Sequence, residues 1–531
     1  MKSAGSDKPT EPLSPGRPRR LDRAPLLSLD LDGALGPDAG PPIHRRLYDG
    51  LRRAILSGRL AAGARLPSSR ALAGELGLSR NTVLAALEQL ASEGYVEGRS
   101  GSGTYVARAL PDPAPDRPSG TPRPGRSAPE SARSAGGAPG GPSARGRLLV
   151  ARPWSARGAS AGERRLFAVG LPEIDAFPFE LWARLLGRRW RHPPAAMAVG
   201  GDPAGHPPLR AAIADHLRRV RAVDCTAEQV IVVSGIRQAV DLTVRLLLDP
   251  GDQVWVEEPG YPGIRAVLGA ADLRILPLPV DEDGLDVAAG ARAAPGARLA
   301  CIAPSHQYPL GVVMSLKRRL DLLGWARDSG AWVIEDDYDS EFRYAGRPLA
   351  AMQGLDRDGR VIYVGSFSKS MFPSLRLGYL VAPPALIDAF LAARATLDDH
   401  APMIAQPALA DFLAEGHFAA HLRRMRRLYA ARQQALLDAA ARHLGGLLRL
   451  APDQAGMHLV AELLPGLARR MDDRGAAAKA HAAGLAAIAL STFYMGPPRR
   501  QGLLLGYAAM REEEMDAAVR RLAAALAAPP A

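Results

Sequence analysis

The sequence predicts two folded domains of different class, an α+β domain near the N-terminus and a larger α/β domain after it. Residues 41–108 contain three amphipathic helical patterns followed by two short β-rich runs. From about residue 164 onward, short β-rich runs alternate with longer helical patterns, which is typical of an α/β fold with a largely parallel sheet. The length of 531 residues also favours more than one domain.

The remaining segments have the composition of unfolded chain. Residues 1–40 are polar and rich in Pro and Gly, which predicts a disordered N-terminal tail. Pro, Gly and Ser supply 21 of the 39 residues at 109–147, which predicts a flexible linker over 109–163. The expected order is therefore a tail at 1–40, a first domain at 41–108, this linker, and a larger domain at 164–527.

Composition excludes several classes of protein. Two cysteines, Cys225 and Cys301, are too few for a disulfide-stapled scaffold or a Cys-rich metal site, and we expect no metal. No apolar run reaches the roughly 18 residues that a membrane span needs. The first 40 residues lack the apolar region of a secretory signal, so we expect a cytoplasmic protein.

The positive charge is concentrated near the N-terminus. The chain carries a formal net charge of +12, and residues 1–150 hold 22 Lys and Arg against 14 Asp and Glu. This asymmetry favours a nucleic-acid partner for the first domain. The alternative is an Arg-rich composition without a function of its own.

Three helices are expected in the first domain. The first has apolar residues every four positions with arginines between them, the second begins at Pro67-Ser68-Ser69 and ends at Gly77, and the third has Ser79 as its N-cap. The side chains that we expect to face the core are Ile43, Leu47, Leu51 and Ile55 in the first helix, Ala71, Leu72 and Leu76 in the second, and Val83, Leu84, Leu87 and Leu90 in the third.

Two short strands complete this domain. Residues 95–96 and 104–106 are β-rich, and a glycine-rich turn at 97–103 joins them. Three helices followed by a hairpin make a winged helix-turn-helix, in which the third helix enters the major groove of DNA.

The motifs of residues 43–106 resemble the GntR family of bacterial transcription regulators. The resemblance rests on Leu66-Pro67-Ser68-Ser69-Arg70-Ala71-Leu72-Ala73, on Leu78-Ser79-Arg80-Asn81-Thr82-Val83 and on Gly101-Ser102-Gly103-Thr104-Tyr105-Val106. It implies double-stranded operator DNA as a partner, since winged helices of this family contact DNA. The residues that fall at the family's contact positions are Arg70, Arg80, Asn81, Thr82 and Gly101. A winged helix that docks only proteins is the alternative.

Two motifs at the start of the larger domain suit a flat, phosphorylated cofactor. Ser234-Gly235 follows a buried strand at 230–233 and begins a helix near Ile236, where backbone amides suit a phosphate. Tyr261 follows a strand at 253–257 in a turn fixed by Pro and Gly, where its ring can stack on a planar group. Each of these signals is weak by itself.

Two further strands lead to ionisable side chains. The strand at 332–334 runs into an acidic stretch at 335–341, and a carboxylate there suits a pyridinium nitrogen, with Tyr338 near the ring hydroxyl. A metal site or a solvated loop are the alternatives for this acidic stretch. The strand at 361–364 leads to Lys369, whose amine can form a Schiff base with an aldehyde. Ser366, Ser368 and Arg376 lie within reach of a phosphate.

Taken in chain order, these motifs resemble the fold-type I aminotransferases over about residues 164–527. The resemblance implies an α/β fold-type I PLP-dependent transferase domain with pyridoxal 5′-phosphate (PLP) as its cofactor. It further implies that Lys369 forms the internal aldimine, that Asp336 pairs with the pyridine nitrogen, that Tyr338 binds the ring hydroxyl and that Tyr261 stacks on the ring. The phosphate would be held by Ser366, Arg376 and the turn of Ser234, Gly235, Ile236 and Arg237.

The two domains together resemble the MocR subfamily of GntR regulators, which has PdxR-like members. The resemblance implies a PLP-dependent transcription regulator whose larger domain senses PLP, or a small amine or amino-acid effector, and controls DNA binding by the winged helix. It implies a head-to-tail homodimer, control of vitamin B6 metabolism or of amino-acid and amine metabolism, and a nucleoid location when DNA is bound. We expect sensing rather than catalysis, and the alternative is an active aminotransferase with an accessory winged helix.

Three positions depart from the pattern of the relatives. A leucine stands in Gly502-Leu503-Leu504-Leu505-Gly506-Tyr507 where an arginine for a substrate carboxylate is common, with Arg499 and Arg500 as candidate replacements. Gly200 stands before Gly-Asp-Pro where a tyrosine is common, and Arg237 stands where a glutamine is common. The leucine in place of this arginine argues against an amino acid as the effector and favours PLP itself as the effector.

Overall fold

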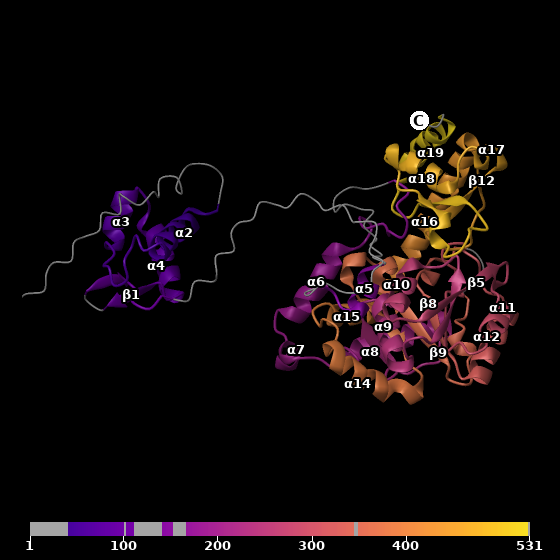
Figure 1. The fold of residues 1–531 in the computed structure, drawn as a ribbon, viewed down its shortest axis with the longest axis horizontal. Helices are drawn as coiled ribbons and strands as arrows, with labels where there is room; N and C mark the ends of the chain where they lie inside the picture. The colour runs from indigo at the N-terminus through magenta and orange to yellow at the C-terminus, as the bar shows by residue number, and fades with distance from the viewer. Residues whose placement is uncertain (1–40, 100–101, 111–140, 152–165, 345–348, 529–531) are drawn as a thin grey trace, which may run out of the picture. The chain divides into compact units, whose positions relative to one another are not determined.

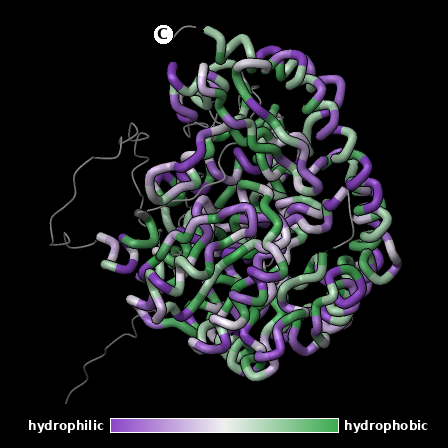
Figure 2. Tube along the Cα trace, turned by 90° about the vertical axis from the view of Figure 1, so that its right-hand side faces the viewer, coloured by the Kyte–Doolittle hydropathy of each residue, from purple (hydrophilic) through white to green (hydrophobic). Residues whose placement is uncertain are grey.

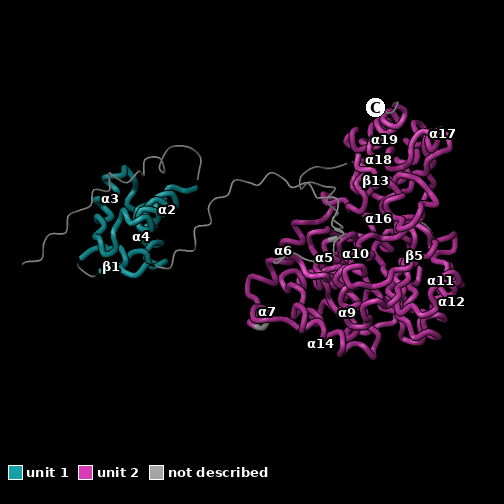
Figure 3. The backbone as a smooth tube through the Cα atoms, viewed as in Figure 1, with its two compact units in different colours: residues 1–134 teal, residues 135–531 magenta. Residues whose placement is uncertain are grey.

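The computed structural model describes residues 41–99, 102–110, 141–151, 166–344 and 349–528. The chain divides into two compact units, residues 1–134 and residues 135–531 (Figure 3). The expected tail at 1–40 and most of the expected linker lie outside the described residues. No helix in the described ranges is long and apolar enough to cross a membrane.

The described residues of the first unit form three helices and a two-stranded antiparallel sheet (Figure 1). Ser68 and Ser79 cap the second and third helices, because their side chains accept hydrogen bonds from the backbone N–H groups of Ala71 and Thr82. Gly77 ends the second helix in the left-handed conformation. The elements are α2 (Ile43–Leu56), α3 (Ser69–Leu76), α4 (Arg80–Ser92), β1 (Val96–Arg99) and β2 (Gly103–Val106).

The core of this unit agrees with the expected apolar pattern except at the helix ends. Leu47, Leu51, Leu72 and Leu90 are fully buried. Four expectations were wrong or only partly right: Ile43 is 44% exposed at the first turn of α2, Ala71 is exposed while Ala73 is buried, and Leu76 and Leu84 are half-buried. The first strand is also longer than expected, because Glu97, Gly98 and Arg99 pair with β2 in antiparallel register.

An eight-stranded mixed sheet forms the centre of the larger unit, in the order β3-β10-β9-β8-β7-β4-β5-β6. The five strands from β9 to β5 in this order are parallel, and β10 and β6 pair antiparallel with their neighbours. Hydrophobic segments run through the interior of this unit (Figure 2). The strands are β3 (Val230–Val233), β4 (Gln253–Glu258), β5 (Arg274–Asp281), β6 (Gly284–Leu285), β7 (Leu299–Ile302), β8 (Trp332–Asp337), β9 (Val361–Ser366) and β10 (Gly378–Val381).

Helices cover this sheet and connect its parallel strands. The 27-residue helix α16 leads from the large sheet into the C-terminal part of the chain. The helices are α6 (Phe179–Trp190), α7 (Ala195–Val199), α8 (Pro207–Arg221), α9 (Ile236–Leu247), α10 (Pro262–Ala270), α11 (Val287–Ala293), α12 (Leu316–Ser329), α13 (Phe367–Ser370), α14 (Ile387–Asp398), α15 (Gln406–Ala414) and α16 (His417–His443).

The C-terminal part forms a lobe around a second, four-stranded antiparallel sheet, in the order β11-β12-β14-β13 (Figure 1). We refer to residues 444–528 as the C-terminal lobe. Its elements are β11 (Leu448–Leu450), β12 (His458–Leu463), α17 (Pro465–Ala468), α18 (Asp473–Ala482), β13 (Ile488–Ala489), β14 (Gly502–Gly506) and α19 (Glu512–Ala527).

One helix lies where the composition predicts a flexible linker. Helix α5 (Ala144–Ala151) falls within the segment 109–163 and contacts α10. Its sequence contains the apolar run Leu148-Leu149-Val150 directly after the Pro- and Gly-rich stretch. A composition averaged over the whole segment hides a run this short, so the reasoning from composition missed it.

Candidate functional site

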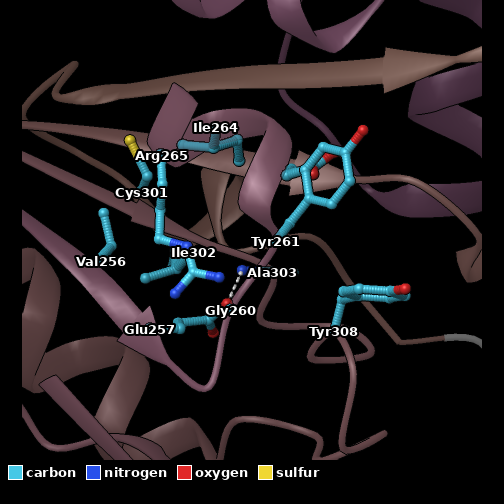
Figure 4. A pocket seen from close by; sticks show the side chains of 11 residues that line it. Val256, Glu257, Gly260, Tyr261, Ile264, Arg265, Cys301, Ile302, Ala303 and Tyr308 are labelled. Carbon is cyan, nitrogen blue, oxygen red and sulfur yellow. Dashed lines mark hydrogen bonds between the residues drawn. The ribbon is translucent and has the colours of Figure 1, made fainter. Parts of the chain in front are cut away.

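A cleft opens at the carboxyl ends of β4, β7 and β8, where parallel strands bring their following loops together. Tyr261, the N-cap of α10, and Tyr308 lie on one side of it, and Glu257 lies on the opposite side (Figure 4). Asp336, near the end of β8, also lines it. The structure therefore brings two of the expected site residues, Tyr261 and Asp336, into one cleft.

The acidic stretch at 335–341 is buried, so it is not a solvated loop. Its members have different partners. Glu335 accepts hydrogen bonds from the backbone N–H groups of Met352 and Gln353, both at 2.8 Å. The Oδ2 atom of Asp337 lies 2.8 Å from Nε of Arg221, within a buried ion pair. Asp339 contacts His306.

Asp336 differs from these neighbours because it faces the cleft. In the described part of the chain, Asp336 forms no ion pair with an arginine, lysine or histidine. Burial, together with the nearby carboxylates of Asp337 and Asp339, raises its pKa to about 8. The amine of Lys369 acts in the opposite direction. A positively charged group in the cleft would therefore stabilise the ionised form of Asp336.

Lys369 lies on the short helix α13, directly after β9. Its Nζ donates a hydrogen bond to the carbonyl oxygen of Gly170 at 2.6 Å. Burial lowers the pKa of this amine, against the raising effect of Asp339 and Asp336. A lowered pKa increases the fraction of neutral amine, which is the form that attacks an aldehyde.

Gly170 is a site residue that sequence reasoning missed. It has φ +75°, and a Cβ atom there would lie 2.6 Å from Nζ of Lys369. A side chain at this position would therefore displace the lysine. No pattern in the sequence marks this glycine, because it lies 199 residues before the lysine.

The turn after β3 and Arg376 lie close together. Gly235 has φ +121°, and Nη1 of Arg376 lies 4.0 Å from where its Cβ atom would be. The backbone N–H groups of Ile236 and Arg237 are in the first turn of α9, where a helix has no carbonyl partners for them. The Arg237 side chain is exposed.

Three further contacts support this region. Ser366 caps α13, with its side chain accepting from the N–H of Ser368 at 3.2 Å. Gln238 accepts from the N–H of Ser234 at 2.6 Å and donates to Asp398 at 2.6 Å. Gln238 was also missed from the sequence, although it directly follows the turn that was identified.

The aromatic residues of the cleft form a series of edge-to-face contacts. The ring of Tyr308 contacts those of Tyr261 and Tyr338, each with centroids 5.8 Å apart and an angle of 88°. Gly263 is required beside them, since a Cβ atom there would lie 2.5 Å from the Tyr261 ring. The hydroxyl of Tyr338 lies 3.0 Å from Nδ1 of His306. No role for His306 was predicted from the sequence.

Leucines occupy the segment of β14 where the relatives commonly have an arginine for a substrate carboxylate. Leu503, Leu504 and Leu505 are fully buried in β14. Arg500 is bound to Glu462 at the surface of the C-terminal lobe. Gly200 is exposed, with an extended backbone that any residue can adopt.

The donor set of the cleft fits a phosphorylated pyridine aldehyde. Such a group needs an amine for its aldehyde, a carboxylate for its ring nitrogen and cationic or N–H donors for its phosphate. Lys369 and Asp336 influence each other's pKa, so the first two groups are close in space. Arg376 beside the Gly235 turn meets the third requirement.

In the first unit, the expected DNA-contacting side chains gather where α3 and α4 begin. Arg70, Arg80 and Asn81 are exposed, and Nε of Arg80 lies 3.5 Å from the hydroxyl of Ser69. Thr82 is half-buried, and its hydroxyl lies 2.8 Å from that of the capping Ser79. Gly101 lies outside the described residues. Two helix N-termini and two arginines therefore share one face of this unit.

The fold and the cleft define a DNA-binding regulator that carries an aminotransferase-type domain. The family model described as bacterial regulatory proteins, gntR family, matches residues 43–106, and that of aminotransferase class I and II matches residues 195–522. The probable rhizopine catabolism regulatory protein MocR of Rhizobium meliloti is 43% identical over 93% of this chain and 96% of its own length. The pyridoxine biosynthesis regulator PdxR of Corynebacterium glutamicum is 32% identical over 92% and 96%. The chain belongs to the MocR subfamily of GntR transcription regulators.

A solved structure supports the fold of the larger unit. The α-aminoadipate aminotransferase LysN of Thermus thermophilus, in complex with a phosphopyridoxyl-leucine, is 31% identical with a TM-score of 0.61, over 68% of this chain and 91% of its own. The larger unit is therefore a fold-type I aminotransferase domain, and the cofactor of this family of domains is PLP.

Proposed function

We propose that this regulator binds PLP at Lys369 and that the bound cofactor controls DNA binding by the winged helix. One observation carries the proposal: the amine of Lys369, whose pKa is lowered, lies near enough to the buried carboxyl of Asp336 in the cleft to lower the pKa of that carboxyl, in a chain that also holds a DNA-binding unit. The cofactor supplies an aldehyde to which an amine can be joined covalently.

Each expected site residue has a role in this proposal. Lys369 holds the cofactor, Asp336 balances the charge of its ring nitrogen, and Tyr261 contacts its ring. Tyr338 faces its ring hydroxyl. The phosphate is held by Arg376, Ser366 and Ser368 and by the turn Ser234, Gly235, Ile236 and Arg237. Arg70, Arg80, Asn81 and Gly101 contact DNA, while Thr82 supports the start of α4.

Control of DNA binding requires two arrangements of the protein that bind the cofactor with different affinity. We propose that the chain acts as a head-to-tail homodimer in the cytoplasm, with two winged helices that bind two half-sites. PLP itself is the proposed effector, because the buried Leu503–Leu505 segment and the Arg500–Glu462 pair leave no arginine at the usual position for an amino-acid carboxylate.

A DNA-binding titration tests the proposal. The purified full-length chain is mixed with the DNA upstream of its own gene, with and without PLP, at one fixed salt concentration. We expect sequence-specific binding whose affinity changes about 5- to 150-fold on addition of PLP, which is the usual range of coupling between sites. The Lys369→Ala variant should bind the same DNA without this response. Absence of specific binding under both conditions would overturn the proposal.

Transaminase activity is a second candidate, favoured by one comparison. The 2-aminoadipate transaminase of Thermus thermophilus is 31% identical over 68% of this chain and 89% of its own length. Turnover of an amino acid and a 2-oxo acid at about 1 s⁻¹ or more, the range of ordinary enzymes, would support it. Conversion of only one amino donor per chain, without turnover, would favour sensing.

A further inference from the structure

Three segments of the larger unit meet at the imidazole of His306. His306 lies in the loop after β7, Asp339 lies just after β8, and Asp453 lies in the C-terminal lobe after β11. Nδ1 of His306 is 2.9 Å from Oδ2 of Asp339, and its Nε2 is 3.2 Å from Oδ2 of Asp453. Nδ1 is also 3.0 Å from the hydroxyl of Tyr338.

The imidazole is held tightly in this position. His306 is 2% exposed. Gly456 has φ +93°, and a Cβ atom there would lie 2.3 Å from Cε1 of His306. Gly311 has φ +77°, and a Cβ atom there would lie 2.1 Å from Oδ2 of Asp453. Two glycines therefore permit an arrangement that leaves the ring little freedom to turn.

The protonation state of His306 decides which way the Tyr338 hydroxyl can donate. If Nδ1 carries no hydrogen, it accepts the hydrogen of Tyr338. If both ring nitrogens carry hydrogen, they donate to the two carboxylates and Nδ1–H is also available to the Tyr338 oxygen. The hydrogen of Tyr338 is then free to point into the cleft.

The charged groups around His306 favour the second state. Burial lowers the pKa of His306, but Asp339 and Asp453 outweigh burial and raise it to about 10. The other titratable neighbours are Tyr338, with which it shares a hydrogen bond, and His458, whose ring centroid is 6.1 Å away. His458 has a pKa lowered by burial and by His306, so it adds no competing positive charge at neutral pH.

We propose that His306, held charged between Asp339 and Asp453, is a positioning residue that turns the Tyr338 hydroxyl towards the ring oxygen of the cofactor. This inference rests on the proposed function, because it assumes that Tyr338 faces that oxygen.

The role of His306 has a consequence for regulation. Asp453 belongs to the C-terminal lobe, so a shift of this lobe changes the hydrogen bond that the cofactor receives, and the coupling is reciprocal.

The visible absorbance of the bound cofactor tests the inference without any assay of activity. The absorbance is followed as a function of pH, and the midpoint is the pH at which half of the absorbance change has occurred. A hydrogen bond donated to the ring oxygen of the cofactor stabilises the ionised form of that oxygen. Loss of the donor therefore raises this midpoint. We expect His306→Leu to raise this midpoint by one pH unit or more, a tenfold change in proton affinity. His306→Asn keeps a donor at the place of Nδ1 and should restore most of the wild-type midpoint.

Two further variants complete the test. Asp453→Asn keeps the shape of the side chain but removes its charge, and should raise the midpoint by a smaller amount; because Asp453 is 23% exposed, this variant is readily tolerated. His458→Asn is the control for loss of a nearby imidazole. His458 is buried, donates to the carbonyl of Pro309 and packs against the ring of Tyr308, but within the described ranges it makes no hydrogen bond to Tyr338, so its midpoint should equal that of the wild type.

The outcomes separate the two proposals. A wild-type chain that takes up no coloured cofactor at Lys369 contradicts the proposed function. A wild-type chain that takes it up, with unchanged midpoints in His306→Leu and Asp453→Asn, contradicts the role of His306 alone. Equal shifts in His306→Leu and His458→Asn would also contradict it, because they would reflect a general disturbance of the loop.

Discussion

Asp336 and Asp337 follow one another at the end of β8, where successive side chains point to opposite faces of the sheet. Asp336 lines the cleft, whereas Asp337 faces Arg221. Burial raises the pKa of Asp337, but Arg221 outweighs burial and holds it below the ordinary value. The two adjacent aspartates therefore have different roles: Asp336 belongs to the site, whereas Asp337 supports the fold by pairing with Arg221.

This difference predicts opposite effects for two matched variants. Asp337→Asn leaves the buried charge of Arg221 without its partner and should lower the free energy of unfolding by about 3–5 kcal/mol. Asp336→Asn should leave the fold intact and weaken cofactor binding by tenfold or more, about 1.4 kcal/mol. Denaturant unfolding and titration with PLP, followed by absorbance, measure the two effects. Equal loss of stability in both variants would contradict the assignment.

The raised pKa of Asp336 also predicts how stability depends on pH in the cofactor-free protein. With a folded pKa of about 8 against an ordinary 3.8, the folded state keeps a proton that the unfolded state has lost between about pH 4 and pH 8. Stability should therefore fall as the pH rises through this window. Glu257, whose pKa burial raises to about 8, contributes in the same direction.

Melting temperatures across that pH range check this prediction. Asp336→Asn cannot titrate, so its melting temperature should fall less steeply with pH than that of the wild type. Asp241→Asn, at an exposed position on α9, should follow the wild type. Parallel curves for Asp336→Asn and the wild type would show that Asp336 is already ionised in the folded state.

Lys369 can be tested with few competing amines, because the chain has only five lysines. Lys317 is 86% exposed and pairs with Asp321. We expect borohydride to fix PLP irreversibly to the wild type and to Lys317→Ala, and to leave Lys369→Ala unlabelled, as read by mass spectrometry. A label of equal yield on Lys369→Ala would place the cofactor elsewhere.

At the scale of elements, helix α4 presents its first turn to solvent. Arg80 is exposed there, and Ser79 caps the helix. Arg80→Ala should weaken operator binding by about 1–3 kcal/mol if it contacts a guanine edge, without a change in melting temperature. Arg59→Ala, an exposed arginine after α2, serves as the control in the same DNA titration. An unchanged affinity would leave Arg80 with a structural role beside Ser69.

The elements also show how far sequence reasoning reaches. Caps such as Ser68 and Ser79 and buried strands such as β3 were predictable, because they depend on residues close in sequence. The strand ends extend further than expected, since Asp336 and Asp337 pair with Val364 and Gly365 of β9. The roles of Gly170 and His306 could not be predicted from the sequence, because they arise from contacts between residues that lie 199 and 147 positions apart.

At the scale of the whole molecule, the two units have separate hydrophobic cores. Among the residues that the structure describes, the buried apolar residues of the first unit, from Leu47 to Val106, pack among themselves and with neighbours no further than Leu110. The larger unit has its own core clusters on both faces of the central sheet. Each unit therefore has the core of a separate domain, and we expect each to fold by itself.

A fragment of residues 41–110 provides the last prediction. Its self-contained core should let it fold cooperatively alone, as domains of this size can do. It should bind operator DNA at least 100-fold more weakly than the full-length chain at equal salt, because two linked winged helices gain affinity from each other in the proposed dimer. PLP should change DNA binding by the full-length chain and have no effect on the fragment. Thermal unfolding and DNA titrations of both proteins measure this. A fragment that binds as tightly as the full-length chain would show that the larger unit does not pair the winged helices.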